Sequence, residues 1–117
     1  MVYDKDNIFA KILRSEIPCD KIYEDEYALS FHDIQPAAKA HLLVVPKFEA
    51  ESFNDFIQNA PAEFVSGFYR AVQKVAAQFG LEQGGYRVIF NHGKDASQTV
   101  FHYHVHILGG EPLKPMN

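Results

Sequence analysis

Three histidines recur at every second position near the end of this 117-residue chain, in the segment FHYHVHILGG at residues 101–110. Residues two apart in a β-strand lie on the same face, so the spacing predicts that His102, His104 and His106 line one face of a strand. The residues that alternate with them are apolar or aromatic and would face the core: Phe101, Tyr103, Val105 and Ile107. Such a row of imidazoles is a solvated strand face, a metal site or a catalytic site.

A metal site is the first functional possibility. Zinc holds its nitrogen ligands about 3–4 Å from one another, whereas same-face neighbours on a strand are about 6.5–7 Å apart at their Cα atoms. His102 and His106, about 13 Å apart, could not both reach one ion easily. A two-histidine site would need a third ligand, such as His41 or Asp33. We predict no metal and no cofactor, and keep a zinc protein as an alternative.

Nucleophilic catalysis is the second possibility. Imidazole is a good nucleophile towards phosphorus and is largely neutral near physiological pH. One histidine of a row can attack while its neighbours donate to the phosphate oxygens and oppose the charge that develops there. The loop NHGKDASQT at residues 91–99 precedes the row, and its backbone N–H groups could cradle a phosphate.

The spacing of apolar residues predicts an α+β fold in which an antiparallel five-stranded sheet carries one short and one long helix. The short helix begins after an Asp6 N-cap and ends at Pro18, and the long helix ends at Gly80. The continuous run LLVV at residues 42–45 indicates a strand buried on both faces. The expected strands are residues 21–26, 27–34, 37–47, 84–93 and 100–110, and the long helix falls within residues 53–80.

Bulk properties exclude several classes of protein. The length predicts one domain over residues 1–117. Net charge is −4 with no Lys/Arg cluster, so we expect no broad nucleic-acid surface. No apolar run is long enough to span a membrane, and no signal-peptide layout is present, so a cytoplasmic location is expected. The single cysteine, Cys19, excludes an internal disulfide and is interpreted as incidental.

Several segments together are similar to the histidine triad (HIT) family, and within it to the HINT branch of nucleoside phosphoramidases. The similarity rests on His-x-His-x-His followed by apolar residues, and it extends in order over nearly the whole chain. The matching segments are IFAKILRSEIPCDKIYEDE, LSFHDIQPAAKAHLLVVPK, GYRVIFNHG and SQTVFHYHVHILGG.

The resemblance implies a distinct role for each of four histidines. His104 would be the nucleophile that forms a nucleotidyl-histidine intermediate. His102 would orient it, chiefly through its backbone carbonyl. His106 would bind the phosphate, and His41 would complete a polar relay.

The resemblance also implies a nucleotide-binding set. Asn91, Gln98 and Thr99 match positions that contact the phosphate or the leaving group, and Thr99 stands where the family more often has serine. Asp33 would accept hydrogen bonds from the ribose hydroxyls, as a single carboxylate can. The apolar slot for the base would consist of Ile8, Phe9, Ile12, Phe31 and Ile34.

The activity that follows from the resemblance is hydrolysis of purine nucleoside 5′-phosphoramidates, releasing AMP and an amine. A homodimer with one continuous sheet is also implied, with the long helix at the interface. The tail EPLKPMN lacks the aromatic residue that many HINT proteins carry, which leaves the preferred leaving group open. Two alternatives are a dinucleoside polyphosphate hydrolase of the same superfamily and a nucleotide-binding regulatory or scaffold protein.

Overall fold

Strand β3 (Ala40–Pro46) is the central element of the fold, and it is buried on both faces. In the computed structural model, which describes residues 2–116, Leu42 and Val44 belong to one apolar cluster. Leu43 and Val45 belong to a second cluster on the other face of the sheet. The run LLVV therefore contributes to two cores at once, which confirms the two-sided burial expected from the sequence.

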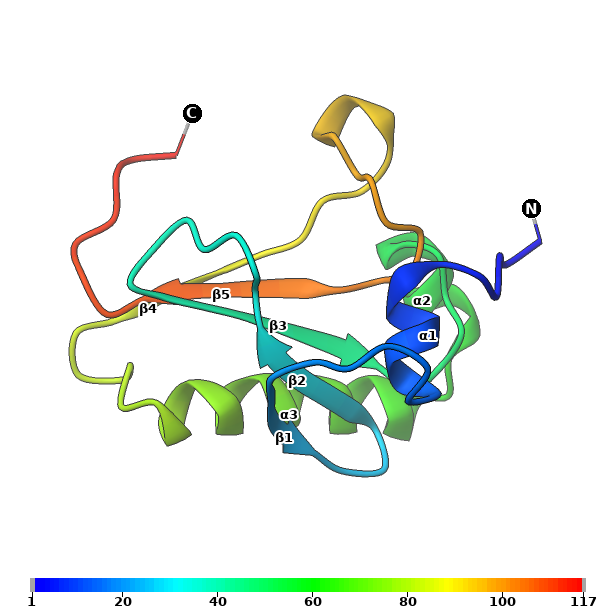
Figure 1. Cartoon of the computed structure of the whole chain (residues 1–117), viewed down its shortest axis with the longest axis horizontal. Helices are drawn as coiled ribbons and strands as arrows, with labels where there is room; N and C mark the ends of the chain where they lie inside the picture. Colours follow the sequence, from blue (N-terminus) through cyan, green and yellow to red (C-terminus); the bar gives the residue numbers. More distant parts are fainter. Residues whose placement is uncertain (1, 117) are drawn as a thin grey trace.

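The strands form one five-stranded antiparallel sheet in the order β1-β2-β3-β5-β4 (Figure 1). β1 and β4 are its two edges. This confirms the predicted fold class. The remaining strands are β1 (Lys21–Glu24), β2 (Ala28–His32), β4 (Tyr86–Ile89) and β5 (Val105–Gly109).

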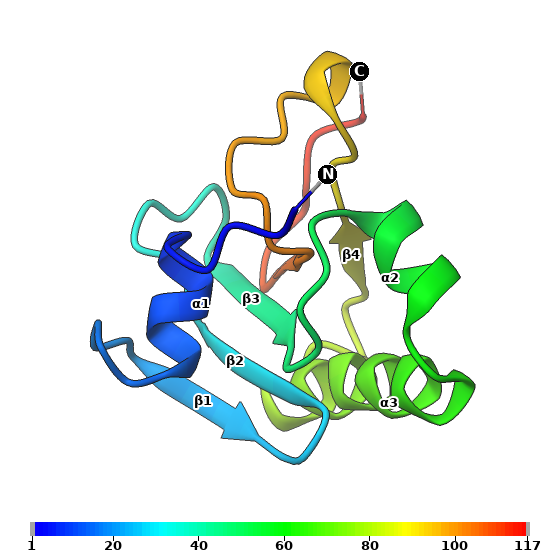
Figure 2. The ribbon, with the colours of Figure 1, turned by 90° about the vertical axis from the view of Figure 1, so that its right-hand side faces the viewer.

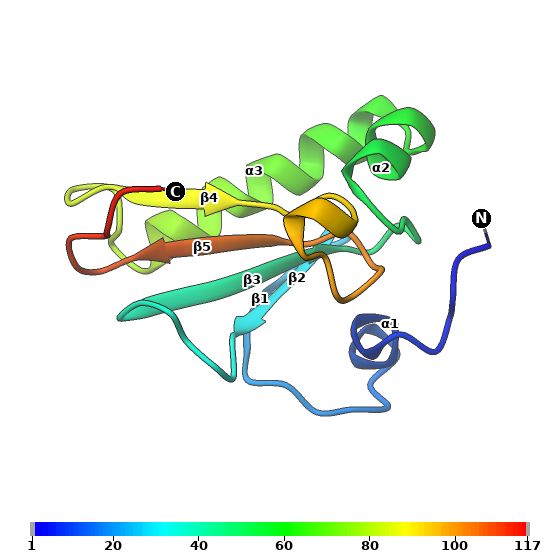
Figure 3. The same cartoon turned by 90° about the horizontal axis from the view of Figure 1, so that it is seen from above.

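Helices cover both faces of the sheet. The long helix α3 (Ala62–Gln78) packs on one face and the short helix α1 (Ile8–Leu13) lies over the other (Figures 2 and 3). On α3, Phe68, Val72 and Val75 are buried, as the helical spacing predicts. The helix terminates at Phe79, and Gly80 follows with a positive φ of 68°, a conformation that glycine adopts without steric cost.

Two expected helix boundaries are corrected by the structure. The N-cap of α1 is Asn7 rather than Asp6, because the Asn7 side chain accepts the Ala10 N–H at 2.8 Å. This helix ends at Leu13, well before Pro18.

The predicted long helix is preceded by a separate helix, α2 (Phe53–Asn59). Ala60 ends α2 and separates it from the long helix, because its backbone is extended, with a ψ of 145°. The residue before a proline is disfavoured in the helical region, and Pro61 follows Ala60. The long helix therefore starts only after this proline.

The histidine segment is only partly a strand. β5 begins at Val105, and residues 101–104 precede it outside the sheet ladder. The Tyr103 N–H donates to the Ala50 carbonyl at 2.7 Å, outside the strands, so it takes no part in the sheet ladder. The strict alternation fails here: Phe101, expected in the core, is 41% exposed, whereas His102 is fully buried.

None of the helices within residues 2–116 combines the length and apolar character required to cross a membrane.

Gly67 on α3 lies directly beneath the Tyr27 ring. A Cβ at this position would lie 2.3 Å from a ring carbon of Tyr27, and that ring packs edge-on against Phe64. We predict that Gly67→Ala lowers the free energy of unfolding by about 1–3 kcal/mol, because the clash outweighs the better helix propensity of alanine. Urea denaturation measures this change.

The same substitution in a Tyr27→Ala background is the control. With the ring removed, Gly67→Ala should raise the free energy of unfolding by up to about 1 kcal/mol. Equal effects of the substitution in both backgrounds would contradict the proposed clash.

Candidate functional site

The His104 ring is held by the backbone of the residue two before it. Its Nδ1 lies 2.8 Å from the His102 carbonyl oxygen. A carbonyl only accepts hydrogen bonds, so Nδ1 carries the proton and Nε2 presents a lone pair. His104 is therefore fixed as the tautomer that a nucleophile requires.

A hydrogen-bonded relay starts at the backbone N–H of Ala37, which donates to His41 Nδ1 at 2.9 Å. The His41 proton must then be on Nε2, which lies 2.9 Å from His106 Nδ1 and 3.3 Å from Asp33 Oδ2. His106 accepts at Nδ1, so its own proton is on Nε2. The Ala37 N–H therefore determines the tautomers of both histidines and leaves His106 with an N–H donor at Nε2.

The same residues define the metal alternative more sharply. Ligand atoms of Asp33, His41 and His106 lie within 4.8 Å of one another. Among the described residues, these three form the cluster of potential ligands that could hold a metal ion. An ion at their centre would need a lone pair on His41 Nε2. The Ala37 N–H places a proton there instead, so this donor set suits a hydrogen-bond relay better than a metal ion.

A cavity of about 390 Å³ opens between α1 and the sheet, beside these histidines. Phe9 links the two features, because it lines the cavity and its ring packs edge-on against His104 with centroids 4.8 Å apart. Asp33 lines the cavity and also contacts His41. The structure thus brings together seven residues predicted from the sequence: Ile8, Phe9, Ile12, Phe31, Asp33, Ile34 and Thr99.

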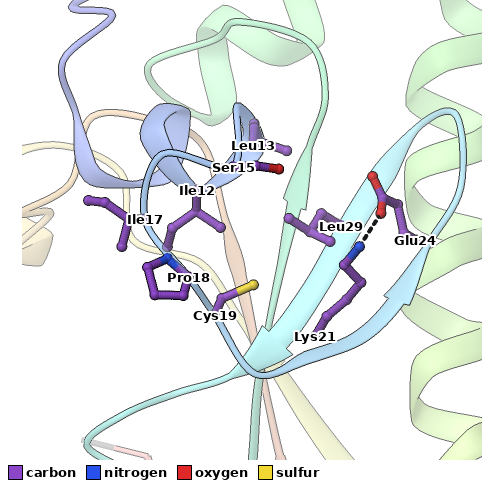
Figure 4. Close-up of a pocket in the computed structure, with 9 residues that line it drawn as sticks. All are labelled: Ile12, Leu13, Ser15, Ile17, Pro18, Cys19, Lys21, Glu24 and Leu29. Carbon is purple, nitrogen blue, oxygen red and sulfur yellow. Dashed lines mark hydrogen bonds and ion pairs between the residues drawn. The ribbon is translucent and has the colours of Figure 1, made fainter.

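The cavity wall includes residues that sequence reasoning missed. Ile17, Pro18 and Cys19, from the loop after α1, line it, as does Leu43. Cys19, interpreted as incidental, also borders a smaller neighbouring cavity of about 230 Å³ (Figure 4). Leu43 could have been found from strand pairing, because it lies directly opposite Phe31 in the β2–β3 register.

Two predicted phosphate contacts are not brought into the cavity wall. The buried Gln98 side chain donates to the carbonyls of Glu51 and Val100 and accepts the Gly93 N–H. Its amide therefore holds the loop before the histidines together. Asn91 is half-buried just beyond β4 and is not among the residues around the cavity. Direct contact of either residue with a phosphate stays a prediction.

Comparison with known proteins identifies the family. The HIT domain matches residues 14–113. The chain belongs to the HIT family. It is 47% identical over 114 residues to an uncharacterised HIT-like protein of Azospirillum brasilense, covering 97% of this chain and 93% of the relative. It is 38% identical over 112 residues to the purine nucleoside phosphoramidase of Escherichia coli K12, covering 96% of this chain and 93% of that protein.

Solved structures agree with this assignment. A HIT family hydrolase from Clostridium thermocellum superposes with a TM-score of 0.88 at 38% identity, covering 97% of each chain. A histidine triad protein from Clostridium difficile gives a TM-score of 0.86 at 40% identity, covering 99% of this chain and all of the other. The resemblance read from the sequence is confirmed at the level of family and fold.

Burial lowers the pKa of every histidine in the row of this HIT domain. The pKa of His102 is lowered to about 4, chiefly by burial. The pKa of His106 is also lowered to about 4, by burial and then by His104 and His41. Burial lowers the pKa of His41 and His104 too, with Asp33 opposing the shift in both. All four imidazoles are therefore neutral at pH 7.

The lowered pKa of His102 gives the HIT domain a pH-dependent stability. An unfolded histidine takes up a proton near pH 6.5, whereas folded His102 does so only near pH 4. The stabilisation is present in full above pH 6.5 and is lost as the pH falls towards 4. We predict that the free energy of unfolding falls by about 2 kcal/mol from His102 alone between pH 7.5 and pH 5.

Urea denaturation at fixed protein concentration tests this prediction. His102→Gln should remove about 2 kcal/mol of the fall and leave the part that comes from the other buried histidines, whereas the exposed His92→Gln should retain the whole fall. An equal fall in the free energy of unfolding in His102→Gln and in the wild-type chain would show that His102 is protonated as easily in the folded state as in the unfolded state.

Proposed function

We propose that this HIT protein hydrolyses purine nucleoside 5′-phosphoramidates of the adenosine 5′-monophosphoramidate type, releasing AMP and an amine. The observation that carries the proposal is the fixed tautomer of His104 beside an apolar cavity. A relative at 38% identity is named purine nucleoside phosphoramidase, which supports the choice of substrate.

The chemistry follows from the positions of the ring protons. The His104 Nε2 lone pair attacks phosphorus, the P–N bond breaks, and the departing nitrogen takes up a proton. Water then attacks the nucleotidyl-histidine, the P–Nε2 bond breaks, and AMP is released. His106 can donate its Nε2–H to a non-bridging oxygen, because His41 occupies its Nδ1.

The cavity suits the nucleoside. Apolar side chains from α1 and β2, including Ile8, Ile12 and Phe31, form walls against which a base can pack. Asp33 accepts the Gln35 N–H at one carboxylate oxygen and faces His41 with the other. A carboxylate has about four acceptor sites, so lone pairs remain for the ribose hydroxyls.

Replacing the nucleophile should abolish turnover. We predict that His104→Ala lowers kcat for a fluorogenic adenosine phosphoramidate by at least about a thousandfold, because the variant lacks the Nε2 lone pair that forms the covalent intermediate. Rapid quenching followed by mass spectrometry should detect a nucleotidyl adduct on the wild-type chain that is absent from the variant. His92→Ala, which changes an exposed histidine outside the cavity, is the matched control.

Turnover by His104→Ala at the rate of the control would exclude this mechanism. Assaying the wild-type chain with a diadenosine polyphosphate in parallel distinguishes the proposed activity from the two alternative functions. A higher kcat/KM for the polyphosphate would assign the site to dinucleoside hydrolysis. Nucleotide binding without turnover of either substrate would favour a regulatory protein.

We also infer that the chain forms a homodimer through β4. This edge strand leaves a row of apolar side chains partly uncovered, and unprotected edges readily pair with another chain. Tyr86 and Val88 are 37% and 43% exposed, and Phe90, just beyond the strand, is 39% exposed. Pairing of two β4 edges would join the two sheets and cover this row.

The dimer is tested by light scattering coupled to size-exclusion chromatography. The wild-type chain should elute at twice its mass of 13.3 kDa. Val88→Arg should shift the mass towards that of a single chain, because a charge would be buried at the interface between the two β4 strands. Ala96→Arg adds the same charge to an exposed position in the loop before β5 and should leave the dimer intact. A wild-type monomer would rule out the pairing.

A further inference from the structure

The His102 side chain is fully buried, yet the proposed reaction uses only its backbone carbonyl. Both of its ring nitrogens have partners. Nε2 lies 2.8 Å from the Pro46 carbonyl oxygen, and Nδ1 is hydrogen-bonded to the Tyr3 hydroxyl. A buried imidazole with both nitrogens hydrogen-bonded, to two partners far apart in the sequence, calls for a physical role.

The direction of each hydrogen bond is determined by the partners. The Pro46 carbonyl can only accept, so Nε2 carries the ring proton. Nδ1 is then a lone pair, and the Tyr3 O–H donates to it. The Tyr3 ring also packs edge-on against the imidazole, with centroids 5.7 Å apart at 73°. His102 is thus a neutral cross-link between the N-terminal segment and the end of β3.

This cross-link fixes a part of the backbone that the sheet does not hold. Residues 101–104 lie outside β5, so no strand ladder defines the direction of the His102 carbonyl. The side chain of His102 and the Tyr103 N–H are the anchors on either side of that carbonyl. Any rotation of this peptide would move the acceptor that fixes the His104 tautomer.

We propose that Tyr3 is a positioning residue for the nucleophile. Its hydroxyl holds the His102 imidazole, which holds the His102 carbonyl against His104 Nδ1–H. Tyr3 lies outside residues 14–113, the part that matches the HIT domain, so this contact is supplied by the N-terminal segment of the chain itself. As far as it concerns turnover, the role rests on the phosphoramidase activity proposed above.

Tyr3→Phe isolates the hydroxyl, because it keeps the ring that packs on His102. The variant leaves a buried lone pair without a donor, and the expected result is a fall in kcat of about tenfold with KM within about twofold of wild type. Ring ¹⁵N NMR gives a second readout that needs no substrate. Wild-type His104 should show the Nδ1–H tautomer, and Tyr3→Phe should shift His104 towards a mixture of tautomers.

Tyr23→Phe is the matched control. Tyr23 lies on edge strand β1, and its hydroxyl donates one hydrogen bond, to Asp25 at 2.8 Å. Its removal should change neither kcat nor the histidine spectrum. If Tyr3→Phe matches this control in both measurements, Tyr3 has no positioning role. If wild type does not turn over the phosphoramidate, the proposed activity fails, and the tautomer comparison alone decides the role of Tyr3.

Discussion

The site depends on one hydrogen bond, from His104 Nδ1–H to the carbonyl of His102. This bond is possible because the chain has not yet entered the sheet at residue 102. In an antiparallel ladder, carbonyls pair with N–H groups of the neighbouring strands. The late start of β5 at Val105 leaves the His102 carbonyl free for a side chain, and residues before the strand thereby acquire a geometry that a regular strand would not give.

Burial is what makes that geometry chemically useful. The two-sided packing of β3 places a dense apolar layer behind the histidines, and α1 covers them from the other side. Charged imidazolium is disfavoured in such surroundings, so the rings stay neutral and keep their lone pairs. Phe9 shows the connection directly, because it belongs to the core under α1, lines the cavity and contacts His104. The packing that stabilises this face of the sheet also shapes the site.

Sequence patterns predict those features that depend on local periodicity. The run LLVV identified the central strand, and seven residues assigned by family resemblance do meet around one cavity. Pro61 indicated the start of α3, whereas the separate helix α2 before it was not predicted. Phe101 was misplaced because period-two alternation holds only where a strand has formed. The Tyr3 contact spans 99 residues of sequence, and no local pattern reports such a distance.

The three histidines of the row have different physical roles despite their equal spacing. His102 is fully buried and satisfied at both nitrogens, whereas His104 and His106 are half-buried and each retains one nitrogen without an intramolecular partner among the described residues. That free atom is a lone pair on His104 and an N–H on His106. The difference arises from the first partner of each ring, a carbonyl in one case and the His41 N–H in the other. An acceptor and a donor therefore lie side by side, with ring centroids 5.2 Å apart, which is the arrangement needed to attack a phosphorus atom while binding its oxygen.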